Sequence, residues 1–95
     1  MSKDMTVTML YDFYGDMLTE KQAEAIDLYY NEDLSLAEIA QHTKITRQGV
    51  RDSLKRAEQQ LRNYEDVLHL AATFCELRKA QQSGDMEKIN QIIDN

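Results

Sequence analysis

Positively charged side chains gather in one short stretch of an otherwise acidic chain. Residues 44 to 62 contain six Lys or Arg and two acids, a local net charge of +4, whereas the whole chain of 95 residues has a formal net charge of −6. On a helix that begins at Arg47, residues 47, 51 and 55 lie on one face, because side chains four positions apart are neighbours. Two guanidinium groups and one ammonium group on one face can neutralise phosphates, so the chemistry indicated is contact with nucleic acid.

The individual side chains of this stretch suit the major groove of DNA. Arg can form two hydrogen bonds with guanine and Gln can form two with adenine, while Lys and Arg also neutralise phosphate. The residues predicted to contact the bases are Arg47, Gln48, Arg51 and Lys55. The residues predicted to contact the DNA backbone are Lys44, Thr46 and Arg56. The alternative interpretation is a charged helix face that is only solvated.

Two helix-start signals position this stretch. Ser35 and Glu38 form a capping box that opens a short helix, and Thr46 supplies the cap of the next helix. Residues 43 to 45 link the two helices, and so short a link forces a sharp crossing angle, which is the geometry of a helix-turn-helix. The side chains predicted to form the core of this motif are Ile39, Ala40, Ile45, Val50 and Leu54.

Two further helices are predicted before the motif. Residues 4 to 17 place apolar side chains at helical spacing, and a second capping box, formed by Thr19 and Gln22, starts a helix that runs up to "NED" at residues 31 to 33. The chain has no Pro and only three Gly, which removes most of the signals that mark strands and turns. We therefore predict an all-α fold, a helix-turn-helix bundle.

A long apolar seam follows the helix-turn-helix. Apolar side chains occur at residues 50, 54, 57, 61, 64 and 68 and continue through Ala71 and Cys75, which predicts one long C-terminal helix ended by Ser83 and Gly84. Asp85 is predicted to cap a short last helix. Around residues 67 to 77 the helix is apolar on most of its circumference, so one neighbouring helix will not cover it. Either two chains associate through residues 61 to 80, or the first and last helices of one chain fold over this surface.

The sequence predicts one helical domain over residues 1 to 95. Its helix-turn-helix is expected at about residues 35 to 62, and a helical segment for dimerisation or packing at about residues 63 to 95. No apolar run is long enough to cross a membrane, and the first residues lack the basic and apolar regions of a signal peptide. Cys75 is the single cysteine, and its position on an apolar face predicts a small buried side chain. We expect a soluble, cytoplasmic protein with no membrane partner.

No set of residues in the sequence indicates catalysis or metal binding. There is no combination of nucleophile, base and oxyanion donors, and no glycine-rich phosphate loop. His42 and His69 have no Cys or acid at a spacing typical of zinc ligands. The aromatic residues predicted to pack in the core, because they occur at helical spacing, are Tyr11, Phe13, Tyr14, Tyr29 and Tyr30. We therefore expect a protein that is not an enzyme and that has no catalytic residue, metal or cofactor.

Several short motifs in residues 10 to 70 carry a family resemblance. The segments "DFY", "LTEKQ", "LYYNEDLSLAEIA", "TRQGV" and "LKRAE" follow one another in that order. In this order and spacing they resemble the YlxM-like family of helix-turn-helix proteins, and the helix-turn-helix half also resembles region four of bacterial sigma factors. The resemblance implies a sigma-region-four-like fold. It also implies a link to the signal recognition particle and its GTPase, and no enzymatic activity.

The chain departs from the family pattern at two positions in the motif. Lys44 occupies the turn position where the family usually has Gly, so this residue has to adopt a positive φ or tighten the turn in another way. Gly49 occupies a position that is usually a small hydrophobic residue, and a glycine there weakens the first helical turn by up to about 1 kcal/mol relative to Ala.

Two functions follow as hypotheses. The first is a DNA-binding transcription regulator whose recognition helix begins at Arg47 and which, as a homodimer, would recognise paired half-sites. The second is a protein or RNA interaction module that modulates signal recognition particle components, the GTPase or the RNA, without reading a DNA sequence. The family resemblance motivates the second hypothesis, as does the acidic remainder of the chain, which could dock on a basic partner.

Overall fold

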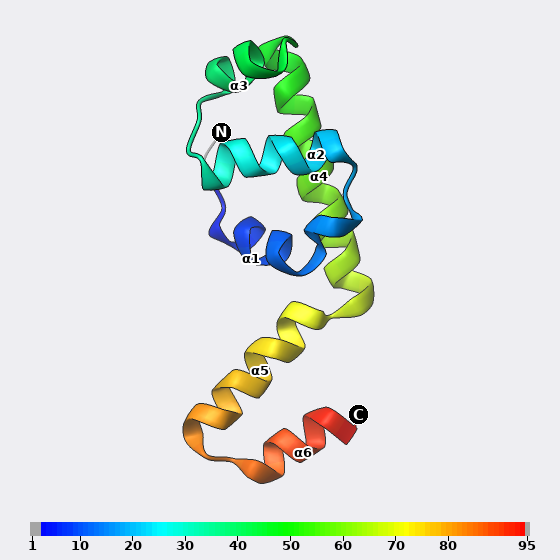
Figure 1. Ribbon diagram of the computed structural model, residues 1–95. Coiled ribbons are helices and arrows are strands. Elements are labelled where there is room, and N and C mark those ends of the chain that lie inside the picture. The colour runs from blue at the N-terminus through cyan, green and yellow to red at the C-terminus, as the bar shows by residue number, and fades with distance from the viewer. Residues whose placement is uncertain (1–2, 95) are drawn as a thin grey trace.

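The computed structural model describes residues 3 to 94 and is built from helices (Figure 1). The described part is 85% helical, with six α-helices and no strand, which confirms the all-α prediction. The elements in chain order are α1 (Met5–Tyr14), η1 (Gly15–Met17), α2 (Glu20–Ile26), η2 (Asp27–Asn31), α3 (Leu36–Thr43), α4 (Arg47–Leu68), α5 (Leu70–Ser83) and α6 (Met86–Asp94).

The predicted capping residues begin their helices. Thr19 and Ser35 each accept a hydrogen bond from the backbone N–H three residues later, and the side chains of Gln22 and Glu38 accept one in return from the cap residues. Thr46 Oγ1 accepts a hydrogen bond from the backbone N–H of Gly49 at 2.9 Å. Asp85 likewise accepts one from the N–H of Lys88 at 2.9 Å. Local contacts between side chain and backbone therefore set the starts of α2, α3, α4 and α6.

Two of the predicted helices change character before they end. The predicted helix over residues 4 to 17 is α-helical only to Tyr14, after which η1 forms a 3-10 turn. The helix that begins at Glu20 widens into the π-helical turn η2 before it reaches the predicted turn. Because a 3-10 turn and a π turn advance the chain by different amounts, they adjust the direction in which the helix ends.

Helix α4 is the long axis against which the other helices of the N-terminal part pack. In Figure 1, α3 lies beside the start of α4, while α2 and α1 cross it farther along. The first four residues of the predicted seam, Val50, Leu54, Ala57 and Leu61, are buried in this packing. The other core residues are Val7, Leu10, Tyr14, Ala25, Ile26, Tyr29, Ile39 and Ala71. The first half of the seam is therefore the core of a four-helix unit, residues 3 to 68, which we call the head.

The long C-terminal helix divides at His69, which differs from the single helix predicted through residue 83. His69 has a left-handed backbone conformation with φ of 55°, and α5 begins after it. Its new direction is held by residues of the head: the N–H of Leu70 donates to the Tyr14 hydroxyl at 3.0 Å, and the N–H groups of Ala71 and Ala72 donate to the Glu65 carboxylate at 3.0 and 2.9 Å. Hydrogen bonding to Tyr14 and Glu65 thus satisfies the first N–H groups of α5.

Helices α5 and α6 form a hairpin that projects from the head (Figure 1). The molecule measures 52 × 22 × 19 Å, and α6 packs mainly on α5. Phe74 of α5 reaches back to Phe13 of α1, with ring centroids 5.6 Å apart. Cys75 is half-buried rather than buried as predicted, because it lies at the edge of the contact between α5 and the head, where its Sγ is 4.0 Å from Met9 Sδ.

Candidate nucleic-acid interface

The turn between α3 and α4 is closed by a residue in the left-handed conformation. Lys44 has φ of 61° and ψ of 37°, so the lysine adopts the positive φ that the sequence required of a non-glycine residue here. The N–H of Ile45 then donates to the carbonyl of Ala40 at 3.2 Å, which ends α3. This conformation costs an L-residue about 1 kcal/mol or more, and it presents the Lys44 side chain to solvent beside the first turn of α4.

The core of the motif is formed by four of the five predicted residues. Ile39, Val50 and Leu54 are buried, and Ala40 is half-buried against them. The prediction that Ile45 belongs to this core is wrong, because its side chain is 49% exposed. The left-handed turn at Lys44 carries Ile45 outward over Gly49, whose missing Cβ would lie 3.6 Å from Ile45 Cδ1.

Three of the predicted cations lie along one edge of α4. Arg47 and Lys55 are exposed, and Arg51 is half-buried because it borders the face of the helix that buries Val50 and Leu54. Within residues 3 to 94 the ion pairs are Lys3 with Asp33 and Arg62 with Asp4. The described carboxylates therefore leave the guanidinium groups of Arg47 and Arg51 available to an external anion.

Gln48 has a partner within its own helix. Its Nε2 donates to Asp52 Oδ1 at 2.9 Å, and both side chains are exposed. Gln48 has to release this bond before it can contact adenine, and the Asp52 carboxylate brings a negative charge onto the outer side of α4. Because the pair is exposed, water can replace the bond at small net cost.

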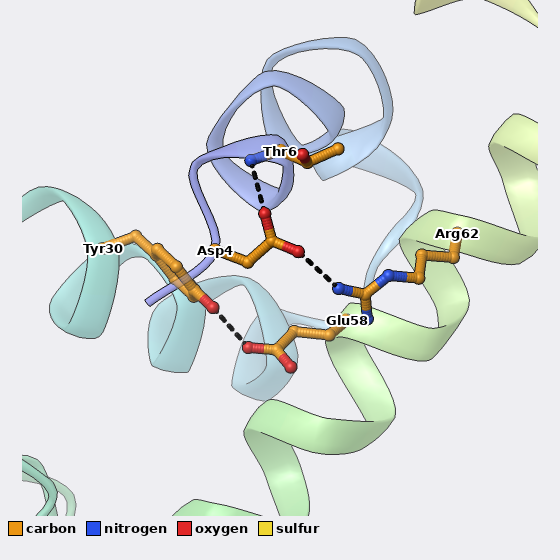
Figure 2. Close-up of polar contacts among 5 residues, drawn as sticks. All are labelled: Asp4, Thr6, Tyr30, Glu58 and Arg62. Atoms are coloured by element: carbon orange, nitrogen blue, oxygen red, sulfur yellow. Dashed lines mark hydrogen bonds and ion pairs between the residues drawn. The ribbon is translucent and has the colours of Figure 1, made fainter. Parts of the chain in front are cut away.

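The basic stretch ends where side chains of α4 tie the head together (Figure 2). Asp4 accepts from the N–H of Thr6 at 2.9 Å and binds Arg62 at 3.1 Å, so that Arg62 fixes the start of α1 on α4. The bond from Thr6, more than the charge of Arg62, holds the pKa of Asp4 below its usual value. The hydroxyl of Tyr30 donates to Glu58 at 2.5 Å, and burial together with this carboxylate raises the pKa of Tyr30. Arg62 therefore adds to the positive charge of residues 44 to 62, but its guanidinium group is paired with Asp4.

A groove of about 720 Å³ lies along the other edge of α4, between the start of α2 and the end of α3. Arg56 lines it together with Lys21 and His42, which sequence reasoning did not connect with the basic stretch. Glu24 and Asp52 line it as well, so the groove has mixed charge. Lys21 and His42 belong to other helices, and only the crossing of α2 and α3 over α4 brings them near Arg56.

The predicted contact residues thus spread around the outer half of α4. Arg47 and Arg56 are nine positions apart, which at 3.6 residues per turn places them about half a turn from one another. Arg47, Arg51 and Lys55 lie toward one edge, and Arg56 faces the groove at the other edge. Lys44 and Thr46 are exposed at the end of α4 that the turn leaves open. A convex basic surface of this kind can enter a groove of DNA, whereas it does not enclose a small ligand.

The described part of the chain lacks the residue groupings typical of two other kinds of site. Residues 3 to 94 contain no group of three or more His, Cys, Asp or Glu side chains placed to hold a metal ion. None of the described helices combines the length and apolar character needed to cross a membrane.

Comparison with known proteins finds a family model and several relatives that match this chain. A family model described as "Putative helix-turn-helix protein, YlxM / p13 like", UPF0122, matches residues 1–94. A UPF0122 protein of Desulforamulus reducens is 47% identical over 88 residues, which are 93% of this chain and 71% of the relative. One of Clostridium kluyveri is 53% identical over 70 residues, covering 74% of this chain and 63% of the relative. One of Caldanaerobacter subterraneus is 47% identical over 87 residues, covering 92% and 70%.

Proposed function

Because the chain belongs to the UPF0122 family of helix-turn-helix proteins, we propose that it is a non-enzymatic DNA-binding regulator that inserts the first half of α4 into the major groove. One observation carries the proposal: Arg47, Arg51 and Lys55 follow one edge of α4, directly after a tight turn, and no described carboxylate binds them. An acidic chain that keeps these cations unpaired has an anion-binding surface confined to one helix.

We expect the two ends of the surface to have different roles. Lys44, Thr46 and the free N–H groups of the first turn of α4 lie where they can bind phosphate, aided by the helix dipole. Arg47 and Arg51 extend along the helix and can reach guanine, and Gln48 can reach adenine once it leaves Asp52. Exposed acids on α1 and η1, among them Asp12 and Asp16, repel phosphate from that side of the head.

The test is a gel shift with genomic fragments at two salt concentrations. The double variant Lys44→Ala/Arg56→Ala, which removes two predicted phosphate contacts, should reduce the slope of log K against log salt by about 1.8, since each phosphate neutralised contributes about 0.9. Arg47→Ala/Arg51→Ala should weaken binding by removing the predicted contacts with bases. Lys79→Ala is the matched control, because Lys79 is an exposed cation on α5 remote from α4 and should leave the slope unchanged. Absent or salt-insensitive binding by the unaltered protein would overturn the proposal.

The charge outside the basic stretch supports a second candidate function. Residues 1 to 43 and 63 to 95 together contain five Lys or Arg against 15 acids, a net charge of −10. Such a surface can dock on a basic protein, and the YlxM resemblance suggests the signal recognition particle, its GTPase or its RNA, as the partner that this chain would modulate. A pull-down against those components with the Arg47→Ala/Arg51→Ala variant separates the two functions, because docking through the acidic surface should survive the change while DNA binding should not.

A further inference from the structure

The hairpin of α5 and α6 leaves much of its apolar surface uncovered. Only Ala71 and Ala80 are buried in α5, and no residue of α6 is buried. The large apolar side chains exposed on the hairpin and on the end of α4 are Val67, Leu68, Leu70, Phe74, Met86 and Ile93. By contrast, the seam residue Leu61, within the predicted association segment, is fully buried in the head. The exposed apolar surface therefore lies at residues 67 to 93, farther along the chain than the sequence indicated.

Helix α6 is short and depends on packing for its stability. It is nine residues long, and isolated helices shorter than about 12 residues are marginal in water. Its apolar residues form one stripe: Ile89 and Ile92 are half-buried, whereas Met86 and Ile93, seven positions apart on the same face, are 64% and 67% exposed. A helix of this kind gains its stability by packing the rest of the stripe against another surface.

The charge of the hairpin distinguishes it from the head. Residues 70 to 94 contain three bases and four acids, a net charge of −1, whereas residues 1 to 69 contain eight bases and 13 acids, a net charge of −5. Two hairpins can therefore approach one another without the repulsion that two heads would impose. The hairpin also lacks the excess of one sign that would select a strongly charged partner.

The size of the hairpin matches one side of a stable interface. It comprises 25 residues, from 70 to 94, and a standard interface uses roughly 20 to 30 residues on each side and buries about 800 Å² per partner. Two helical hairpins that pack face to face make a four-helix bundle, in which each stripe covers the other. We propose that the α5–α6 hairpin is a self-association surface whose partner is the same hairpin of a second copy.

Sedimentation equilibrium of the full chain, without DNA, tests the proposal. From about 1 to about 100 µM, the mass should rise toward twice the monomer mass of 11.1 kDa. The double variant Met86→Glu/Ile93→Glu should stay monomeric because it places four charges in the bundle. Met5→Glu/Met17→Glu is the matched control, because it replaces two exposed apolar residues of the head and not of the hairpin. This variant should still dimerise. A monomer at about 100 µM, or a dimer formed by the Met86→Glu/Ile93→Glu variant, would overturn the proposal.

The Met86→Glu/Ile93→Glu variant could unfold α6 as well as removing the contact between two hairpins, so a second measurement uses the unaltered protein. Hydrogen exchange of the unaltered protein should show that amides of residues 86 to 94 lose protection on dilution, while those of α4 keep it. Equal protection at all concentrations would count against a second copy on this surface. Neither measurement involves DNA, so failure here leaves the DNA-binding proposal intact. Only the inference that a dimer recognises paired half-sites rests on both proposals.

Discussion

At the scale of single residues, Tyr14 makes the contact on which the direction of α5 depends. Its side chain is fully buried, and its hydroxyl donates to Glu65 Oε1 at 2.5 Å. The oxygen of the Tyr14 hydroxyl also accepts a hydrogen bond from the N–H of Leu70. Burial and the neighbouring carboxylate raise the pKa of Tyr14, so the hydroxyl remains a donor at any physiological pH. The phenol therefore bonds to both sides of the break at His69.

Replacing Tyr14 by Phe should destabilise the protein by about 1 to 3 kcal/mol, because it leaves the N–H of Leu70 without a partner and removes one of the two hydrogen bonds that Glu65 Oε1 accepts. Urea unfolding followed by circular dichroism measures the change. Tyr11→Phe is the matched control: Tyr11 is a half-buried tyrosine of the same helix whose hydroxyl bonds the carbonyl of Ala23 at 3.5 Å, so its loss should cost less. Equal costs for the two variants would contradict the role given to Tyr14.

Glu65 makes the stability of this junction depend on pH. Burial favours the neutral carboxyl, but hydrogen bonds from Tyr14, Ala71 and Ala72 outweigh it and hold the pKa of Glu65 below the ordinary value for a glutamate. A carboxyl with a depressed pKa in the folded state stabilises the protein above its unfolded pKa, and this contribution is lost as the pH falls through the folded value.

The variant Glu65→Gln should therefore be less stable than the unaltered protein at pH 7, and the difference should shrink as the pH falls below the ordinary pKa of a glutamate. Urea unfolding at a series of pH values gives this difference directly. Asp66→Asn is the control, because Asp66 is an exposed acid next in the chain. A difference for Glu65→Gln that stays constant down to acid pH would show that the amide is destabilising for a reason other than charge.

Lys44 combines a strained backbone with a predicted phosphate contact. One substitution should therefore have opposite effects on stability and on DNA binding. Lys44→Gly should raise stability by about 1 kcal/mol, because glycine adopts φ of 61° without the steric cost. It should also lower the salt slope of DNA binding by about 0.9, since one phosphate contact is lost. His69→Gly is the control, because His69 also has a positive φ, of 55°, but lies at the opposite end of α4 from the predicted DNA contacts. This variant should leave the salt slope unchanged. Unfolding curves and gel shifts supply the two readings.

At the scale of the elements, the sequence predicted those features that depend on neighbours in the chain. Thr19, Ser35, Thr46 and Asp85 cap helices because each bonds a backbone N–H within a few residues, so their effect is visible in the local pattern. The basic face of α4 was predictable for the same reason, since helical spacing alone places Arg47 and Arg51 on one side.

The features that the sequence did not predict depend on contacts between distant residues. The break at His69 is held by Tyr14, which lies 51 positions from Glu65 and 56 from Leu70. Apolar periodicity continues across the break, so it predicted a continuous helix. Ile45 has the right spacing for the core, but the left-handed turn at Lys44 directs its side chain outward. Lys21 and His42 approach Arg56 only through the crossing of three helices.

At the scale of the whole molecule, the proposed DNA surface and the proposed self-association surface lie at opposite ends. The start of α4 is at one end of a molecule 52 Å long, and the α5–α6 hairpin is at the other (Figure 1). If two hairpins pair, both heads can reach one DNA duplex only when the twofold axis runs along this long dimension. The heads then lie side by side, and each is about as wide as the short dimensions, 22 and 19 Å.

This geometry predicts the spacing of the DNA sites. Half-sites related by inversion with centres one helical turn apart, about 34 Å or 10 base pairs, leave room for two heads of this width on one side of the duplex. Inserting about five base pairs between the half-sites should abolish the gain from the second site, because it turns one half-site to the far side of the duplex. Met86→Glu/Ile93→Glu should bind a paired site and a single site equally well, whereas Met5→Glu/Met17→Glu should keep the preference for the pair. Fluorescence anisotropy with labelled duplexes measures both comparisons. If the Met86→Glu/Ile93→Glu variant kept the preference for a paired site, the two heads would not act through this dimer.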